Sequence, residues 1–274
     1  MLEKGMKKEF KETILIGDIK ENSHIIIYKD KDKETYSIKI LHQPEKLENI
    51  KKTYSNCQIL SINGMNFDTQ ELNPENSSKS KRALEYAIKM HKNQYRHDGT
   101  EYIVHPIRVA NYVKKYSSSS HLEELYTAAL LHDVLEDCES TYYDIVNMFG
   151  IQVASIVSEL TNDDDMLHEL GKTKYLEIKM KNMTSWALTI KLCDRLDNTC
   201  DLVCSNEKFR NKYLKDTLEI INYVIDNRKL NKTHIEIIKE IVNKVNLVAK
   251  EYKYNEYYEE IDKTKEKTKS LYKK

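Results

Sequence analysis

The chain has 274 residues, of which 40% are hydrophobic and 32% charged, and its 44 basic residues balance its 44 acidic ones. This length and composition are ordinary for a globular protein, so we expect one full domain and a smaller one. The balanced charge excludes a global field that would attract nucleic acid or an anionic membrane, and no stretch reaches the roughly 20 apolar residues that cross a bilayer.

The N-terminus and the cysteines favour the cytoplasm. The opening segment MLEKGMKKEFKE is basic but has no apolar stretch behind it, so we expect no secretory signal. The five cysteines include no CxxC pair, which is typical of a reducing compartment. Cys200 and Cys204 stand one helical turn apart, but a zinc site needs a second pair, so we interpret both as core thiols.

Residues 1–75 are predicted to form a small, β-rich α+β module. Short β-branched runs, TILIGDI, HIIIYKD, ETYSIKILH and QILSINGM, alternate with charged segments that suit turns. A helical pattern begins at Pro44, in PEKLENIKKTY. The module contains no cluster of histidine, cysteine or carboxylate at ligand spacing. Regulation, docking of a protein partner and stabilisation remain open as its role.

A polar connection, QELNPENSSKS at residues 70–80, separates this module from a helical domain. From Lys79 onward apolar residues recur at helical spacing, and glycine and proline become rare. We therefore predict a mainly α protein whose residues 79–250 form an all-helical domain. Residues 251–274 are predicted to be a charged C-terminal tail or helix.

The segment AALLHDVLED carries the first sign of chemistry. It places His132 and Asp133 side by side on an apolar helix, where an unpaired buried charge costs several kcal/mol. A cation held by both side chains would compensate that charge. Glu136 and Asp137 follow one turn later on the same side of the helix. The alternative, a cap or an exposed charged face, fits the apolar flanks less well.

Two further segments contain residues of the same kind. His105 precedes Pro106 at a predicted helix start, and Asp194 lies in the apolar run LTIKLCDRLDNTCDL with Asn198 four residues later. Combined with the pair in AALLHDVLED, they make two imidazoles and two carboxylates. This mixed set suits one divalent ion, such as manganese, iron or another borderline cation.

The chain resembles the HD-type hydrolase domain of the RelA and SpoT alarmone family, and most of all its short stand-alone members of the metazoan SpoT-homologue type. The resemblance rests on HKNQYRHDGTEYIVHP, AALLHDVLED, FGIQVASIVSELTNDD and KLCDRLDNTCDL, in the family's order. It implies an all-helical HD phosphohydrolase fold. It also implies that an ion, usually manganese, is held by His105, His132, Asp133 and Asp194. Glu136 and Asp137 would orient or activate the attacking water, and His91 would be a packing histidine.

The resemblance further implies substrate contacts. Arg96 would meet the purine base, Asn198 the ribose or phosphate region, and Tyr213 the nucleotide. Lys172 is a candidate phosphate contact. These residue types suit the roles, because a guanidinium stacks on a base and an amide binds sugar hydroxyls.

Two departures from the family pattern concern the pocket. The family usually has lysine and serine where this chain has His97 and Asp98, so a titratable group replaces a fixed charge. Asp197 stands where the family often has histidine or tyrosine, and we expect it to add a negative charge near the pocket.

The predicted function is hydrolysis of the 3′-pyrophosphate of guanosine alarmones. One alternative is the same chemistry on another phosphorylated nucleotide, an adenosine alarmone or the 2′-phosphate of NADPH. The other is a protein that senses a nucleotide without hydrolysing it and signals through its N-terminal module. Glu136 and Asp137 favour the enzyme, because a sensor does not need to activate water.

Overall fold

The computed structural model describes residues 24–30, 36–41, 57–62, 65–66, 78–97 and 99–272. The chain divides into two compact units. The first comprises the residues up to Ser77 together with Gly99–Glu101, and the second comprises Ser78–Asp98 and Tyr102–Lys274.

The first unit contains an antiparallel sheet with the strand order β2-β1-β3-β4. Its strands are β1 (His24–Asp30), β2 (Tyr36–Leu41), β3 (Cys57–Ile62) and β4 (Met65–Asn66). In β1, Ile26 lies opposite Lys39 of β2 and Ile62 of β3, and the register with β3 shifts between Ile27 and Tyr28. The run TILIGDI and the helix predicted from Pro44 lie outside the described residues.

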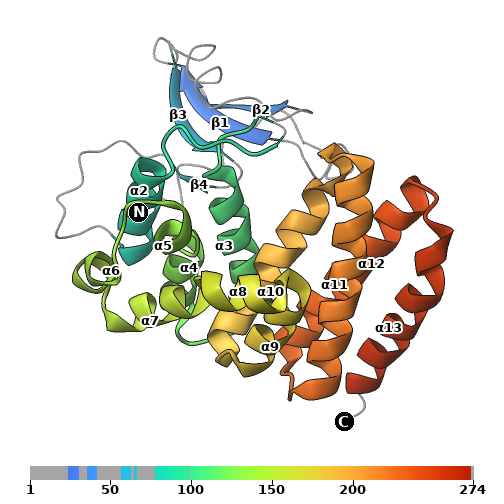
Figure 1. Ribbon diagram of the computed structural model, residues 1–274. Helices are drawn as coiled ribbons and strands as arrows, with labels where there is room; N and C mark the ends of the chain where they lie inside the picture. Colours follow the sequence, from blue (N-terminus) through green and yellow to red (C-terminus); the bar gives the residue numbers. More distant parts are fainter. Residues whose placement is uncertain are drawn as a thin grey trace. The chain divides into compact units, whose positions relative to one another are not determined.

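The second unit is helical, as the periodicity after Lys79 predicted (Figure 1). Its α-helices are α2 (Lys79–Met90), α3 (Val104–Tyr116), α4 (Leu122–Leu130), α5 (Val134–Asp137), α6 (Tyr142–Phe149), α7 (Ile151–Leu160), α8 (Asp164–Leu170), α9 (Lys172–Asn182), α10 (Ser185–Cys200), α11 (Glu207–Asn227), α12 (Lys232–Glu251) and α13 (Tyr258–Leu271). Short 3₁₀ turns, η3 (Asp201–Cys204) and η4 (Asn255–Tyr257), follow α10 and precede α13. Within the described residues, no helix is long and apolar enough to span a bilayer.

Helix α10 is the centre of the helical core. It packs against α3, α7 and α12, and most of its side chains from Ala187 to Thr199 are buried. Because two of these buried side chains are carboxylates, Asp194 and Asp197, the most buried helix of the unit also carries charge into its interior.

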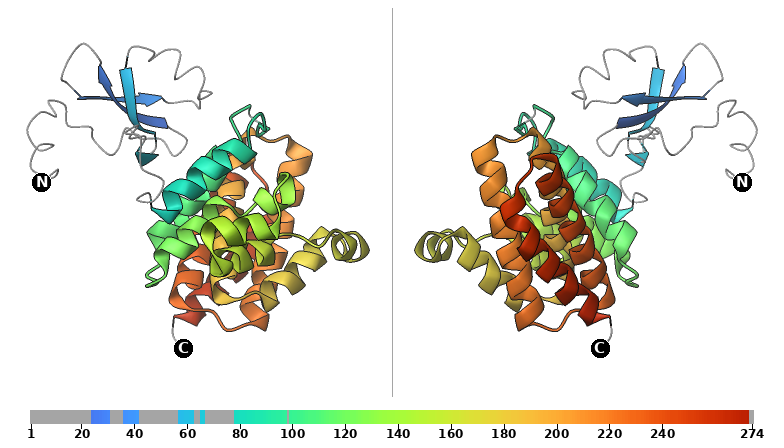
Figure 2. Two further views of the ribbon diagram at one scale, coloured as in Figure 1. Left: turned by 90° about the vertical axis from the view of Figure 1, so that its left-hand side faces the viewer. Right: turned by 90° about the vertical axis from the view of Figure 1, so that its right-hand side faces the viewer.

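Local signals explain where the helices begin and end. The side chain of Ser78 caps α2, and Thr141 forms a capping box with Asp144 at the start of α6. Gly150 and Gly171 adopt positive φ values of 90° and 76°, which only glycine tolerates easily, at the α6–α7 and α8–α9 junctions. Helix α8 buries no side chain and projects from the rest of the helical unit (Figure 2).

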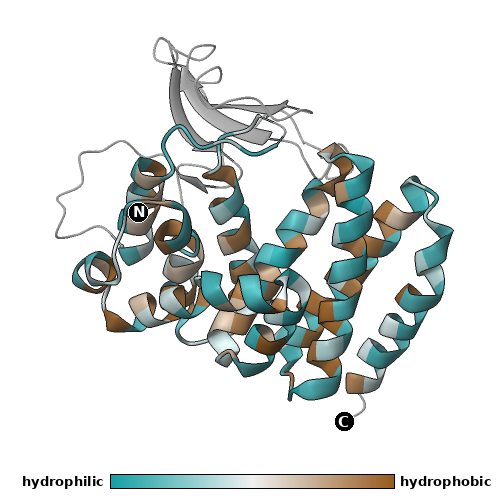
Figure 3. Cartoon of the chain, viewed as in Figure 1, coloured by the Kyte–Doolittle hydropathy of each residue, from teal (hydrophilic) through white to brown (hydrophobic). Residues whose placement is uncertain are grey.

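Helix α13 lies within residues 251–274, which were predicted to form a charged tail or helix. It packs on α12 and buries Ile261, Thr264 and Thr268. Asn222 of α11 donates hydrogen bonds to Glu260 and to Thr264. The outward side of α13 is largely hydrophilic (Figure 3), so its charged composition reflects one exposed face and not a frayed chain.

Candidate active site

His132 and Asp133 lie in a turn between two helices, not within one continuous helix as the apolar pattern predicted. Helix α4 ends at Leu130 and α5 begins at Val134. The backbone tightens here, since the amides of Leu131 and Val134 each donate to a carbonyl three residues earlier. The turn therefore directs both side chains away from the α4 axis, towards α3 and α10.

Each of the two histidines has its Nδ1 atom engaged by an acceptor. His132 Nδ1 lies 2.8 Å from the carbonyl oxygen of Ala129, and His105 Nδ1 lies 2.7 Å from Asp197 Oδ2. These acceptors assign the proton of each neutral ring to Nδ1 and leave the lone pair on Nε2. This is the arrangement in which histidine binds metal ions.

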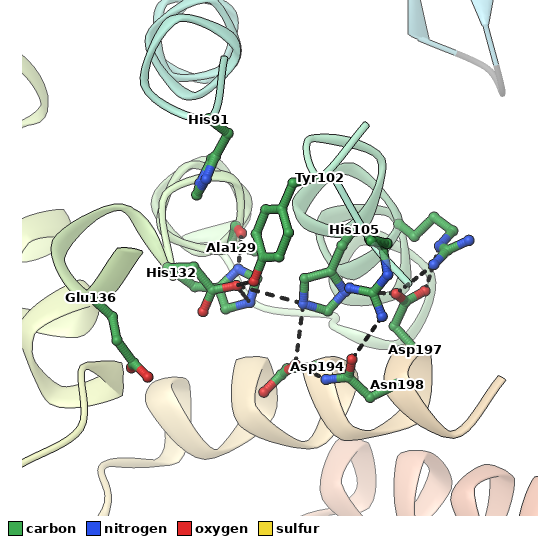
Figure 4. Close-up of polar contacts among 12 residues, drawn as sticks. His91, Tyr102, His105, Ala129, His132, Glu136, Asp194, Asp197 and Asn198 are labelled. Carbon is green, nitrogen blue, oxygen red and sulfur yellow. Dashed lines mark hydrogen bonds and ion pairs between the residues drawn. The ribbon is translucent and has the colours of Figure 1, made fainter. Parts of the chain in front are cut away.

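The two Nε2 atoms converge with carboxylates from α10 and from the α4–α5 turn (Figure 4). Ligand atoms of His105, His132 and Asp194 all lie within 4.8 Å of one another. Asp133 Oδ2 lies 3.0 Å from His132 Nε2 and 3.6 Å from His105 Nε2, and Asp194 Oδ1 lies 3.2 Å from His105 Nε2. His132 Nε2 is buried and has no hydrogen-bond partner. The four side chains thus fit a divalent cation, which would use this lone pair.

The charges of the cluster favour positive charge at its centre. Burial by itself would raise the pKa of Asp194, but Lys191, His105 and His132 hold that pKa well below its usual range. Burial would lower the pKa of His105, yet Asp194 and Asp197 raise it to about 9. Because the carboxylates stay ionised and attract a proton to the imidazole, a cation can replace that proton.

Glu136 and Asp137 lie in α5, beside the cluster. The Glu136 carboxylate points towards the side of the cluster on which Asp194 lies (Figure 4). Both residues are exposed. The pKa of Asp137 is raised, first by desolvation and then by the negative charges of Asp133 and Glu136.

Sequence reasoning missed two residues that contact the carboxylates. The Tyr102 hydroxyl donates to Asp133 Oδ2 at 2.7 Å, and Lys191 Nζ lies 3.0 Å from Asp194 Oδ2. Lys191 was detectable in principle, because it precedes Asp194 by three residues on the same helix. Tyr102 had no such signal, since it precedes its helix. His91, predicted to be a packing residue, is buried and its ring lies 4.9 Å from that of Tyr102.

A cavity of about 250 Å³ lies next to the cluster and shares Tyr102 and Asn198 with it. Its lining residues are Tyr95, Arg96, His97, Tyr102, Asn198, Asp201, Leu202, Cys204, Ser205, Phe209 and Tyr213. The rings of Phe209 and Tyr213 are stacked 5.8 Å apart, and that of Phe209 meets His97 edge-on at 6.0 Å. The cavity therefore has aromatic walls and a few polar groups, as ligand pockets commonly do.

The predicted substrate residues fall into two groups. Arg96, His97, Asn198 and Tyr213 line the cavity together. Lys172 is exposed at the start of α9 and is not among the lining residues, so the geometry does not support a phosphate contact there. Asp98 lies outside the described residues.

Asp197 lies next to the cavity-lining Asn198 in α10, but it does not present its charge to the cavity. Its side chain is fully buried and does not line the cavity. It accepts a hydrogen bond from Arg108 Nη2 at 3.0 Å and lies beneath His105. The reason is helical spacing: Asp194 and Asp197, three residues apart, share one broad face of α10, but only Asp194 reaches the centre of the cluster.

Several known proteins are similar to this chain, and a family model matches within its helical unit. The sequence model described as HD domain matches residues 83–228. The guanosine-3′,5′-bis(diphosphate) 3′-pyrophosphohydrolase of Aquifex aeolicus is 34% identical in an alignment of 197 residues that covers 69% of this chain and 26% of that protein. The Drosophila melanogaster enzyme of the same name, MESH1, is 30% identical over 164 residues, 59% of this chain and 90% of that protein.

A solved structure described as "A metazoan ortholog of SpoT hydrolyzes ppGpp and plays a role in starvation responses" has the same fold. It superimposes with a TM-score of 0.52 and 26% identity, over 61% of this chain and 96% of that one. The chain therefore spans about a quarter of the Aquifex relative, but nearly all of the shorter ones.

Proposed function

The chain belongs to the HD-domain family, and we propose that it is a metal-dependent phosphohydrolase that removes the 3′-pyrophosphate of guanosine tetra- or pentaphosphate. The products would be GDP or GTP and pyrophosphate. The observation that carries this proposal is the convergence of His105, His132, Asp133 and Asp194 beside a cavity with aromatic walls. The choice of guanosine is supported by relatives named for that reaction, one of which the chain matches over 90% of its length.

His105, His132, Asp133 and Asp194 would hold one divalent ion. We assign manganese, because two imidazoles and two carboxylates form a mixed set that suits a borderline cation with open coordination positions. Iron, zinc and magnesium are the alternatives. When bound, such an ion lowers the pKa of water and offsets negative charge on phosphate oxygens.

Glu136 and Asp137 are assigned the proton transfer from the attacking water. Asp137 suits the role of a base, since its raised pKa gives it more affinity for a proton than an ordinary aspartate has. Glu136 is held by hydrogen bonds to Asn162, so its carboxylate is fixed beside the cluster. General acid or base catalysis of this kind contributes about 10²- to 10⁴-fold to a rate.

The cavity is assigned to the nucleoside. The Arg96 guanidinium and the Tyr213 ring provide flat surfaces for a purine base, and the Asn198 amide provides a partner for sugar hydroxyls. His97, which is exposed at the same cavity, is assigned to a phosphate. We propose that residues 79–250 form the hydrolase domain and that residues 1–75 take no part in the chemistry. We also propose that the protein acts in the cytoplasm.

The test is turnover by the full chain with manganese. Guanosine tetraphosphate, guanosine pentaphosphate, an adenosine alarmone and NADPH are incubated separately, and products are separated by anion-exchange chromatography. We expect GDP or GTP with equimolar pyrophosphate from the guanosine compounds, and no product from the Asp194→Ala variant. Faster release of phosphate from NADPH would assign the site to 2′-phosphates. Nucleotide binding without any product would make the protein a sensor.

A further inference from the structure

Asp197 and Arg108 form a pair behind the proposed metal ligand His105. Asp197 is fully buried, and its Oδ2 atom accepts hydrogen bonds from His105 Nδ1 at 2.7 Å and from Arg108 Nη2 at 3.0 Å. In a second contact, Arg108 Nε lies 2.7 Å from Asp197 Oδ1, as an ion pair without hydrogen-bond geometry. A buried carboxylate needs such partners, because its desolvation is costly.

Arg108 is itself held from a second side. Its Nη2 atom donates to Asp201 Oδ2 at 2.7 Å, and the same oxygen lies 2.8 Å from Arg96 Nε. Arg96 in turn donates to Asn198, whose amide donates to Asp194 Oδ1 at 2.5 Å. The contacts thus form a closed circuit that runs from His105 around to Asp194, which itself lies 3.2 Å from His105 Nε2. In this circuit, Arg108 is the cation that links the buried carboxylate of Asp197 to the half-buried carboxylate of Asp201.

We propose that Arg108 and Asp197 are positioning residues that set the affinity of the site for its divalent ion by fixing the ring of His105. The proposal rests on the proposed function only in taking His105 as a metal ligand. The Asp197 carboxylate accepts the Nδ1 proton, which keeps the lone pair on Nε2 and directs it to Asp133 and Asp194. Arg108 holds the Asp197 carboxylate in place through its Nη2 and Nε atoms.

Arginine has properties here that other residues lack. Its donors are arranged in a rigid fork and it cannot accept a hydrogen bond, so only acceptors can face it. In an Asp197→Asn variant, the new amide has one oxygen and one NH₂ group for these positions. Whichever way it turns, the NH₂ group faces a donor of Arg108, and in one orientation it also faces His105 Nδ1. That orientation favours the tautomer with its proton on Nε2, the atom that must be free for the metal.

The experiment measures manganese binding to the full chain by isothermal titration calorimetry, without nucleotide. Asp197→Asn and Arg108→Met are each expected to weaken Mn²⁺ binding by about 10- to 100-fold, the usual effect of losing a residue that orients a ligand. Asp201→Asn touches Arg108 but not His105, and is expected to change the affinity by less than about threefold. Lys114→Met, at an exposed cation of the same helix α3, is the matched control and should bind as the wild type does.

A second readout separates positioning from general damage to the fold. At saturating Mn²⁺ the kcat of Asp197→Asn should return to within a few fold of the wild-type value, whereas a damaged fold would not be rescued by metal. If either single variant fails to fold, the double variant Arg108→Met with Asp197→Asn leaves no unpaired buried charge and is expected to lose about tenfold in affinity.

Wild-type Mn²⁺ affinity in Asp197→Asn, or in the double variant, would overturn the proposal, as would equal losses in Asp201→Asn and Asp197→Asn. These outcomes are distinct from failure of the proposed function. If the variants show the expected pattern of Mn²⁺ affinities but the wild type hydrolyses no nucleotide, the positioning role is supported and the proposed function is wrong. If the wild type hydrolyses guanosine tetraphosphate but Asp197→Asn leaves the Mn²⁺ affinity unchanged, the proposed function is supported and the positioning role is wrong.

Discussion

Asn162 holds the carboxylate of Glu136 with two hydrogen bonds, from its backbone amide to Oε2 at 3.1 Å and from its side-chain Nδ2 to Oε1 at 2.8 Å. Asn162 lies in the connection between α7 and α8, far from Glu136 in sequence. Both carboxylate oxygens are therefore fixed in one orientation beside the proposed metal ligands. Lys179 in turn holds the Asn162 side chain, since its ammonium group donates to Asn162 Oδ1 at 3.0 Å.

Removing this support is expected to slow turnover without affecting the metal. An Asn162→Ala variant keeps the backbone contact but loses the side-chain one, so the Glu136 carboxylate gains freedom to rotate. We expect kcat to fall by about 10- to 100-fold, the scale of a small misplacement of a catalytic group. Manganese content, measured by elemental analysis, should stay at the wild-type value. Asn147→Ala, at an exposed asparagine of α6, is the control, and equal kcat in both variants would remove Asn162 from the mechanism.

The division of roles between ligands and bases predicts different losses at two positions. Asp194→Ala should remove both bound metal and activity, because its carboxylate lies among the converging ligand atoms. Glu136→Ala should retain metal and lose about 10²- to 10⁴-fold in kcat. Elemental analysis and turnover of the same preparations test both statements. Metal loss of the same size in Glu136→Ala would make Glu136 a ligand and contradict the assignment.

Adjacent residues carried most of the information that the sequence offered about the site. His132 and Asp133 stood out because a charged pair interrupted an apolar run, and the structure brings them to His105 and Asp194. The convergence of three separate segments came from the family resemblance, since spacing within one segment says nothing about which helices pack together. The break between α4 and α5 could not be predicted, because the apolar pattern of AALL and VL continues through it.

Asp197 shows why the rest could not be predicted. Its position was known and its charge was known, yet its partner Arg108 is 89 residues away. Only packing of α3 on α10 reveals that this carboxylate is buried beneath His105 and not exposed in the pocket. Long-range pairing of this kind leaves no periodic signal, whereas the helices themselves do.

Removal of the metal should lower the thermal stability of the protein. Without a cation, the half-buried carboxylate of Asp133 and the buried carboxylate of Asp194 repel each other with fewer opposing charges nearby. Since a ligand that binds only the folded state stabilises it, Tm should rise with Mn²⁺ concentration after chelation. Differential scanning calorimetry of chelated protein measures this, with Asp194→Ala as the control that should show no response. A metal-independent Tm in the wild type would argue against a resident cation.

The last prediction concerns Lys179, whose pKa burial lowers to about 8, with the neighbouring charge of Lys191 adding to the effect. Its ammonium group donates to the carbonyl oxygens of Leu160 and Thr161 as well as to Asn162. In the unfolded chain its pKa is the ordinary value of 10.5. Between about pH 8 and 10.5 the unfolded chain therefore binds more protons at Lys179 than the folded protein does. Under the linkage relation, this makes the free energy of unfolding rise with pH in that window.

A Lys179→Met variant lacks this contribution while keeping a similar side-chain length. The free energy of unfolding of the wild type, minus that of the variant, should therefore be larger at pH 10 than at pH 7. We expect an increase of about 1 to 2 kcal/mol, reduced from the full shift because Lys179 is partly exposed and its charge is screened. Urea denaturation at both pH values measures the difference, in which the titration of all other groups largely cancels. Lys181→Met, at an exposed lysine of the same helix, should give the same difference at both pH values, and a Lys179→Met difference that also stays constant would show that Lys179 remains charged throughout.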